Sequence, residues 1–130
     1  MPNTPPCYAI YMCGLYLEYV KEKGGVAFFK ALAEERSRLI YEAIDGSDGY
    51  YLNKIDVAVR SRMNIPFVIK GGNADLATAF IAEAAAAGFI ELAGHRSVGG
   101  IRASIYNGMS LEGVQKLIEF MGEFKSRNNS

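Results

Sequence analysis

The chain has 130 residues, half of them hydrophobic, and its 14 basic residues balance 14 acidic ones. This length and composition predict one domain with a packed core and argue against disorder. A net charge of zero gives no basis for binding nucleic acid or a membrane surface, so we expect neither partner. Any anion site must therefore be local.

The N-terminal segment predicts an extended lead-in followed by an apolar helix. Thr4 can cap a helix that begins near residue 5 or 6 and stops at Gly24-Gly25. The run 7–20 is too short to span a bilayer and is typical of a core or interface helix. We expect Cys7 and Cys13 to be buried there as small apolar residues, in a reducing, cytoplasmic setting. A helix that is apolar on every side needs cover on every side, so we infer that the chain is the tail of a larger protein.

The middle of the chain predicts alternating helices and strands. Helical spacing of apolar residues predicts a helix over 26–44, and a turn leads to a short strand at 50–52. Residues 63–69 predict a strand that Pro66 places at an edge or a bulge. Asn73 is expected to cap a helix over 74–87.

The last part predicts two strands around a glycine-rich loop and a final helix. The strands are expected at 89–92 and 101–106, and Ser110 caps a helix from 111 to about 125. The whole order of elements indicates an α+β, two-layer fold. In it, a small, mostly antiparallel sheet carries helices on one face.

The loop between the last two predicted strands has the features of a binding site. It holds His95, which is the only histidine, next to Arg96, and Arg102 follows in the strand. Arginine offers a planar fork of donors suited to carboxylate and phosphate, and Gly99-Gly100 allows close backbone approach. Arg102 lies in an apolar strand and needs an anionic partner from the protein or from a ligand. These residues predict a site for a doubly anionic small molecule, while structural roles remain open for each.

The other polar residues of interest can be interpreted as structural or surface groups, and two of them also as phosphate-binding groups. Asn3 and Thr4 can cap the first helix, or a phosphate can bind at that helix N-terminus. We interpret Arg60, Arg62 and Asn64 as structural or surface groups. The sequence has no metal-binding histidine pair, no glycine-rich nucleotide loop and no activated lysine. It offers binding groups and no convincing catalytic residue.

Three stretches resemble the C-terminal part of the phosphoserine aminotransferases. They are Asn3-Thr4-Pro5-Pro6, residues 60–67 (RSRMNIPF) and residues 94–107 (GHRSVGGIRASIYN), and the ending at 111–121 is similar too. The resemblance implies the small C-terminal domain of a fold-type I aminotransferase over residues 1–130. The large domain, with the lysine that holds pyridoxal 5'-phosphate, would lie outside the chain.

The resemblance also implies a role for each candidate residue. Asn3 and Thr4 match the pair that reaches the cofactor phosphate from the neighbouring subunit of a homodimer. His95 and Arg96 match groups that bind the distal phosphate or carboxylate of the substrate, and Arg102 matches the arginine for its α-carboxylate. The implied reaction moves an amino group from glutamate to 3-phosphohydroxypyruvate, giving 2-oxoglutarate and O-phosphoserine for serine biosynthesis.

Because the lysine is outside the chain, residues 1–130 alone are expected to be inactive. Two alternatives stay open. The chain could be a stand-alone anion-binding or regulatory module, or one subunit of a split enzyme. Binding of O-phosphoserine to the isolated chain would favour the module. Recovery of activity on mixing with a large-domain chain would favour the split enzyme.

Overall fold

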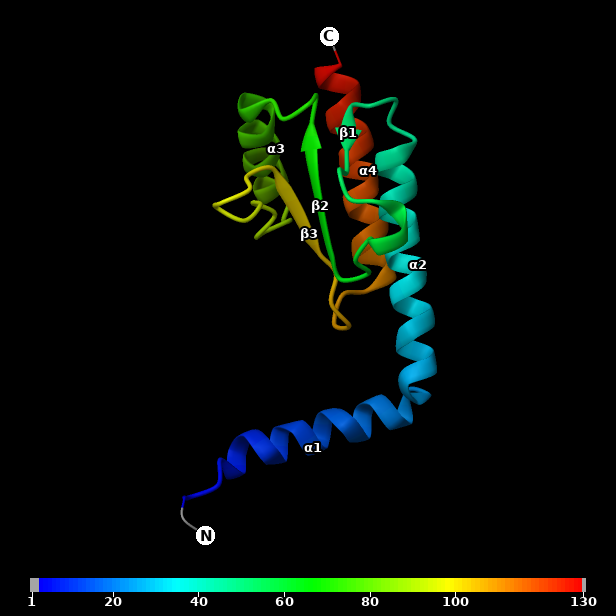
Figure 1. The fold of residues 1–130 in the computed structure, drawn as a ribbon, viewed down its shortest axis with the longest axis vertical. Coiled ribbons are helices and arrows are strands. Elements are labelled where there is room, and N and C mark those ends of the chain that lie inside the picture. Colours follow the sequence, from blue (N-terminus) through cyan, green and yellow to red (C-terminus); the bar gives the residue numbers. More distant parts are fainter. Residues whose placement is uncertain (1–2, 130) are drawn as a thin grey trace. The chain divides into compact units, whose positions relative to one another are not determined.

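A computed structural model describes residues 3–129 of the chain. They form two compact units, with the boundary between Leu32 and Ala33. The elements, shown in Figure 1, are α1 (Cys7–Glu22), α2 (Gly25–Asp45), β1 (Tyr51–Leu52), a short 3-10 helix η1 (Val57–Val59), β2 (Asn64–Ile69), α3 (Ala74–Ala86), β3 (Ile101–Ser104) and α4 (Leu111–Asn128).

The first unit holds α1 and the first turns of α2. Helix α1 begins at Cys7 after Pro6, and no side chain caps it, so the prediction that Thr4 caps this helix is wrong. No residue of α1 is buried. The prediction of buried cysteines is also wrong, because Cys7 and Cys13 are both exposed on a helix that the described residues leave uncovered.

The other helices follow their sequence signals. The Asn73 side chain accepts a hydrogen bond from the Leu76 backbone N–H at 3.0 Å, and Ser110 accepts one from Gly113 at 3.0 Å. Each bond satisfies a donor that has no partner within its helix. The predicted caps of α3 and α4 are therefore confirmed.

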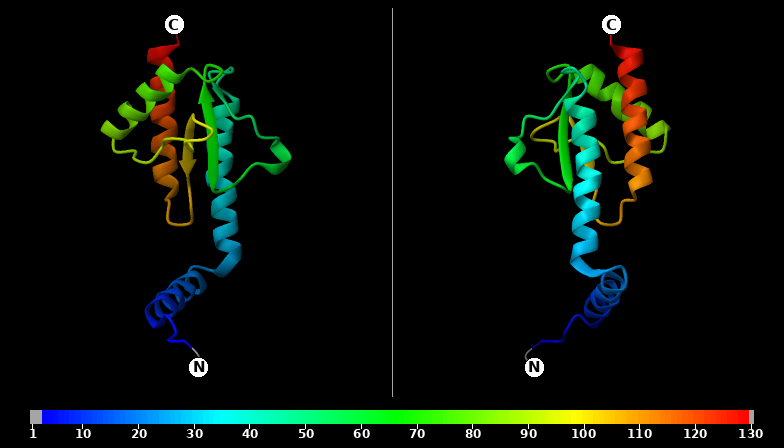
Figure 2. Two further views of the ribbon diagram at one scale, coloured as in Figure 1. Left: turned by 60° about the vertical axis from the view of Figure 1, so that its left-hand side comes forward. Right: turned by 90° about the vertical axis from the view of Figure 1, so that its right-hand side faces the viewer.

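The second unit packs three helices against one face of a small sheet. The strand order is β1-β2-β3, with both pairings antiparallel. In β2 and β3 alternate residues are buried, and these face the core with side chains of α2, α3 and α4. In Figure 2 (right), α3 and α4 lie to one side of β2. The predicted α+β fold with helices on one face is confirmed.

From the sequence, Pro66 is expected at a sheet edge or a bulge, but it lies in the central strand, and the pairing of β2 with β3 runs past it without an inserted residue. Pro66 stands opposite Arg102 of β3. On its other side β1 has already ended, because Leu52 pairs with Val68 and the chain then turns away. The Asn53 side-chain amide donates to the Pro66 carbonyl instead. The N and O atoms of a strand residue face the same side of the strand. Since the Pro66 carbonyl faces Asn53, where β1 has ended, the position of the missing Pro66 N–H also faces no neighbouring strand.

Residues 89–92 do not form the predicted strand. None of these four residues is in a strand, and the isolated bridge to β3 next to them joins Ala93 to Ile101. Glu91 has a φ of +61°, which interrupts an extended backbone. Strand β3 also ends at Ser104, two residues before the predicted end. The sheet therefore has three strands, and the 94–100 loop leads directly into its outer strand β3.

Candidate anion-binding site

The 94–100 loop is closed at its base by backbone hydrogen bonds. The Gly94 N–H donates to the Gly100 carbonyl at 2.9 Å, and the Arg102 N–H donates to the Leu92 carbonyl at 2.8 Å. At the tip, the N–H groups of Val98 and Gly99 both donate to the His95 carbonyl at 2.8 Å. The loop is thus a defined turn carried by β3.

Two glycines are required by this close backbone packing. Gly100 has a φ of +70°, and a Cβ atom there would lie 2.9 Å from the Phe67 carbonyl oxygen. A Cβ atom on Gly94 would lie 2.0 Å from the Gly99 carbonyl oxygen. From the sequence, the Gly99-Gly100 pair is expected to let a ligand approach the backbone closely. In the structure, Gly100 instead lets the loop backbone lie close to β2.

His95 lies at the loop tip and is exposed. Its Nδ1 atom is 2.6 Å from the Ser97 hydroxyl oxygen. The Ser97 backbone N–H also donates to Nδ1, at 3.3 Å. The ring is therefore held by its own loop through one nitrogen, and within residues 3–129 its Nε2 atom has no hydrogen-bond partner.

Arg102 lies in β3 on the sheet face opposite the core. Its neighbours Ile101 and Ala103 point into the core and are buried, whereas Arg102 is partly exposed. Its Nε atom is buried, and no other described residue accepts a hydrogen bond from it. A buried guanidinium donor without an acceptor costs free energy, so this position favours an anionic ligand.

The other arginines show which partners a guanidinium has in this protein. Four have a carboxylate within 4.0 Å, namely Arg38 with Glu35 and Glu42, Arg60 with Asp45, Arg62 with Glu34, and Arg127 with Glu83 and Glu123. Arg36 is buried and donates through Nη1 to the carbonyls of Tyr106 and Met109, while its Nε and Nη2 atoms are buried without an acceptor among the described residues. Within the described part of the chain, Arg96 and Arg102 have neither kind of partner. The loop therefore carries local positive charge without a protein counter-ion.

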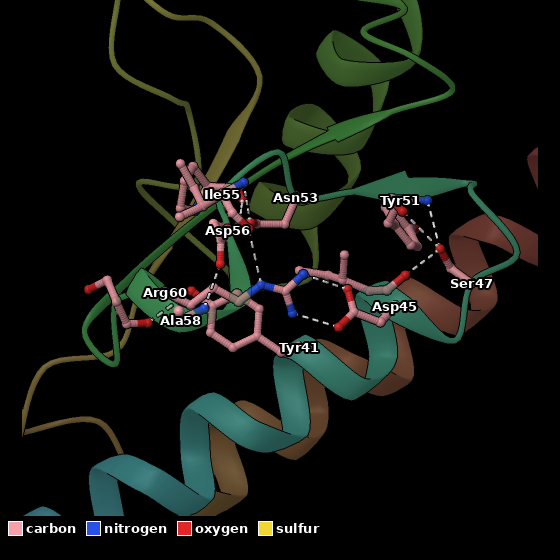
Figure 3. A network of polar contacts seen from close by, with 12 residues as sticks. Tyr41, Asp45, Ser47, Tyr51, Asn53, Ile55, Asp56, Ala58 and Arg60 are labelled. Carbon is pink, nitrogen blue, oxygen red and sulfur yellow. Dashed lines mark hydrogen bonds and ion pairs between the residues drawn. The ribbon is translucent and has the colours of Figure 1, made fainter.

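Arg60 belongs to a separate structural cluster, shown in Figure 3. Its guanidinium lies 4.6 Å from the centre of the Tyr41 ring and donates to both carboxylate oxygens of Asp45, at 2.5 and 2.9 Å. The Asp45 carboxylate raises the pKa of Arg60 above its usual value. Tyr41 in turn donates to the Ser61 carbonyl at 2.9 Å. These contacts fix the segment after Asn53 to α2, as expected for a structural group.

Asn3 and Thr4 lie in the first unit, whereas the loop belongs to the second. Both are exposed and precede α1, outside any helix or strand. The structure thus brings together His95, Arg96 and Arg102 on one loop and its strand. It does not place the Asn3–Thr4 pair relative to them.

An apolar hollow of about 370 Å³ lies on the core side of β3. It is lined by residues 88–92, 103–105, 109, 113, 114 and 117. None of the candidate anion-binding residues lines it, so the charged loop and this hollow are different features. Among residues 3–129 no cluster of three potential metal ligands occurs, and no helix there is long and apolar enough to cross a bilayer.

The sequence analysis assigned no role in the site to the polar groups around the candidate residues, and it interpreted Asn64 as a structural or surface group. Ser97 contacts His95, as described above. Beside Arg102, the Asn64 side-chain amide donates to the Tyr106 hydroxyl at 2.8 Å, and Ser104 donates to the Asn64 side-chain oxygen at 3.1 Å. The only available signal was the serine two residues after a histidine in a turn, since serine commonly bonds locally in turns.

Comparison with known proteins gives consistent similarities. Residues 2–117 match the family described as Aminotransferase class-V. The chain is 51% identical to the phosphoserine aminotransferase of Laribacter hongkongensis over 128 residues, covering 98% of this chain and 35% of that protein. It is 50% identical to the phosphoserine aminotransferase of Burkholderia vietnamiensis, covering 97% of this chain and 34% of that protein.

Solved structures agree with the sequence comparison. The phosphoserine aminotransferase of Bacillus circulans subsp. alkalophilus superposes with a TM-score of 0.92 at 42% identity, covering 96% of this chain and 34% of that one. The pyridoxal-phosphate-bound enzyme of Trichomonas vaginalis gives a TM-score of 0.87 at 40% identity, covering 94% of this chain and 34% of that one. The chain spans about a third of the length of the relatives it matches.

Proposed function

Because the chain belongs to the class-V aminotransferase family and is homologous to part of the phosphoserine aminotransferases, we propose that it is the small-domain part of such an enzyme. The reaction would transfer the amino group of glutamate to 3-phosphohydroxypyruvate. One observation carries the proposal for this chain's own residues. Arg96 and Arg102 lie in one loop and its strand without a carboxylate partner in the described residues, while four other arginines have one.

The charges of the substrates fit this arrangement. Glutamate carries two carboxylates, and the phosphorylated 2-oxo acid carries a carboxylate and a phosphate. We propose that the Arg102 guanidinium binds the α-carboxylate common to both, because its fork of donors suits a planar carboxylate. His95 and Arg96 would bind the distal anion. Holding both ends orients the reacting carbon, which is a large part of such catalysis.

The residues before α1 suit the phosphate of pyridoxal 5'-phosphate. The N-terminus of this 16-residue helix has no side-chain cap, and Asn3 and Thr4 are exposed just before it. Free backbone N–H groups and the helix dipole favour a bound phosphate there, and an amide and a hydroxyl add two donors. The proposal assigns these two residues to the cofactor phosphate, in a homodimer through the neighbouring subunit. The cofactor itself supplies the electron withdrawal on which transamination depends.

No lysine of this chain is assigned the covalent role, so residues 1–130 are expected not to transaminate by themselves. The test compares the purified chain with the same chain joined to the remaining two thirds of a phosphoserine aminotransferase. Formation of 2-oxoglutarate from glutamate and phosphohydroxypyruvate is measured with added pyridoxal phosphate. We expect turnover only in the joined protein. Turnover by the isolated chain would contradict this expectation, and activity on simple mixing would favour the split enzyme.

Substitutions in the joined enzyme separate the roles of the three site residues. Arg102→Ala should lower kcat/KM for glutamate and for the phosphorylated substrate alike, by about 10- to 100-fold, the value of a hydrogen bond to a charged group. His95→Gln and Arg96→Ala should affect O-phosphoserine more than unphosphorylated serine in the reverse reaction.

The control is Arg127→Ala, which removes an exposed arginine of α4 that pairs with Glu83. It should leave kcat/KM for both substrates unchanged. Equal losses for phosphoserine and serine in the His95 and Arg96 variants would refute their assignment to the distal phosphate. Binding of O-phosphoserine by the isolated chain, lost in Arg102→Ala, would instead support the anion-binding module.

A further inference from the structure

The side chain of Ser97 makes the most specific polar contact on the loop. Its hydroxyl oxygen lies 2.6 Å from His95 Nδ1, and its own backbone N–H lies within hydrogen-bonding distance of the same atom at 3.3 Å. A backbone N–H can only donate. Nδ1 must therefore present its lone pair to Ser97, and the Ser97 hydroxyl donates to it as well.

From this geometry we propose that Ser97 is a positioning residue that fixes His95 as the Nε2–H tautomer, so that the neutral ring offers a donor to an anionic ligand. In a neutral imidazole one nitrogen donates and the other accepts, and the partner of one nitrogen decides which. Since Nδ1 accepts from Ser97, the ring proton lies on Nε2. That nitrogen has no acceptor among residues 3–129, so it remains available.

The turn makes this contact possible. The N–H groups of Val98 and Gly99 both donate to the His95 carbonyl, and in the backbone turn that they close Ser97 reaches His95 Nδ1. Arg96 lies between the two residues and supplies a positive charge. An anion bound by Arg96 would thus meet a ring already carrying its proton on Nε2. No proton uptake at Nδ1 is then needed for His95 to donate.

The identity of the anion rests on the proposed function, in which it is the distal phosphate of the substrate, but the tautomer does not. The presence of a single histidine gives a direct readout. We propose long-range 1H–15N spectra of the 15N-histidine-labelled chain, recorded at a pH where the ring is neutral. The 15N chemical shift distinguishes a protonated from an unprotonated ring nitrogen. We expect Nε2 protonated and Nδ1 unprotonated and hydrogen-bonded.

Three variants test the role of the hydroxyl. Ser97→Ala removes it, so the Nδ1 resonance should move toward that of a nitrogen without a donor and the Nδ1–H tautomer should gain population. Ser97→Thr keeps a hydroxyl and should restore the original spectrum. Ser126→Ala removes a hydroxyl in α4 that bonds the Gly122 carbonyl, and should change nothing. A protonated Nδ1 in the unaltered chain, or a Ser97→Ala spectrum identical to it, would overturn the proposal.

If the isolated chain gives broadened spectra, the same spectra are recorded on the joined enzyme. The His95 resonances are identified there as those that disappear in His95→Gln. There Ser97→Ala should raise KM for the phosphorylated substrate about fivefold, the value of one ordinary hydrogen bond, with kcat little changed and Ser97→Thr restoring KM. If the spectra show the Nε2–H tautomer but Ser97→Ala leaves KM unchanged, the positioning of the ring by Ser97 is supported and the phosphate is refuted as the ligand of His95.

Discussion

Gly100 determines how closely the 94–100 loop lies against β2. Its φ is +70° and the space for a Cβ atom is occupied by the Phe67 carbonyl oxygen at 2.9 Å and a Val68 methyl group at 3.1 Å. We expect Gly100→Ala to lower the free energy of unfolding by about 2–3 kcal/mol, through backbone strain plus displacement of β2. Urea unfolding of the chain followed by circular dichroism measures this loss.

Gly71 provides a matched control for that substitution. Its φ is +72°, nearly the same as that of Gly100, but nothing lies within 4 Å of the position that a Cβ atom would take. Gly71→Ala should therefore show only the conformational cost, about 1 kcal/mol. Equal losses at both positions would show that the contact with Phe67 does not matter and that the loop can move away from the sheet.

At the scale of single residues, the sequence identifies the charged groups better than their surroundings. His95, Arg96 and Arg102 stand out because their residue types fit anions. That Arg96 and Arg102 have no acid partner within residues 3–129 depends on where every carboxylate lies in space, which sequence spacing does not reveal. The Ser97 contact depends on the backbone of one turn, which residue identity alone does not determine.

At the scale of elements, local signals predicted α2, α3, α4 and β2 well. Asn73 and Ser110 act through bonds within their own first helical turns, so their caps can be recognised locally. The failures have non-local causes. Pro66 is tolerated in a central strand because β1 is only two residues long. Residues 89–92 have strand-like composition, but positive φ at Glu91 interrupts them.

Among the four α-helices, α1 is the one that we expect to be least stable within the described residues. It has 16 residues and none is buried, and an isolated helix of that length is marginal in water. We expect its backbone amides to exchange rapidly in the isolated chain, while those of β2 and α4, which carry buried residues, exchange slowly. Hydrogen–deuterium exchange read by mass spectrometry measures both.

The same experiment on the joined enzyme tests why α1 is apolar all round. If the remainder of the enzyme covers this helix, its amides should become protected there, while β2 and α4 change little. Strong protection of α1 already in the isolated chain would contradict the expectation, and would mean that a second copy or a different arrangement covers it. Exposed Tyr8, Ile10 and Leu17 would then lie in that contact.

At the scale of the whole molecule, the core of the second unit links sheet and helices through Tyr51. This side chain is 3% exposed, and its hydroxyl donates to the Met121 carbonyl of α4 at 2.8 Å. Burial raises the pKa of Tyr51 above its ordinary value of 10.0. The folded protein therefore retains a proton that the unfolded chain loses first.

The sign of the resulting pH dependence follows from that difference. Above pH 10 the folded state binds more protons than the unfolded state, so the free energy of unfolding falls as pH rises, by up to about 1.4 kcal/mol per pH unit for this one group. Below pH 10 the contribution of Tyr51 to the free energy of unfolding is fully present.

Tyr51→Phe should make the decrease of the free energy of unfolding at alkaline pH shallower, as measured by urea unfolding at a series of pH values. It should also lower stability at neutral pH, because it removes the bond to Met121. Tyr8→Phe, at an exposed position of α1, controls for the loss of a phenol. An alkaline decrease equally steep in Tyr51→Phe would mean that other groups dominate, such as the half-buried Tyr41 and the buried Tyr50, whose pKa values burial also raises.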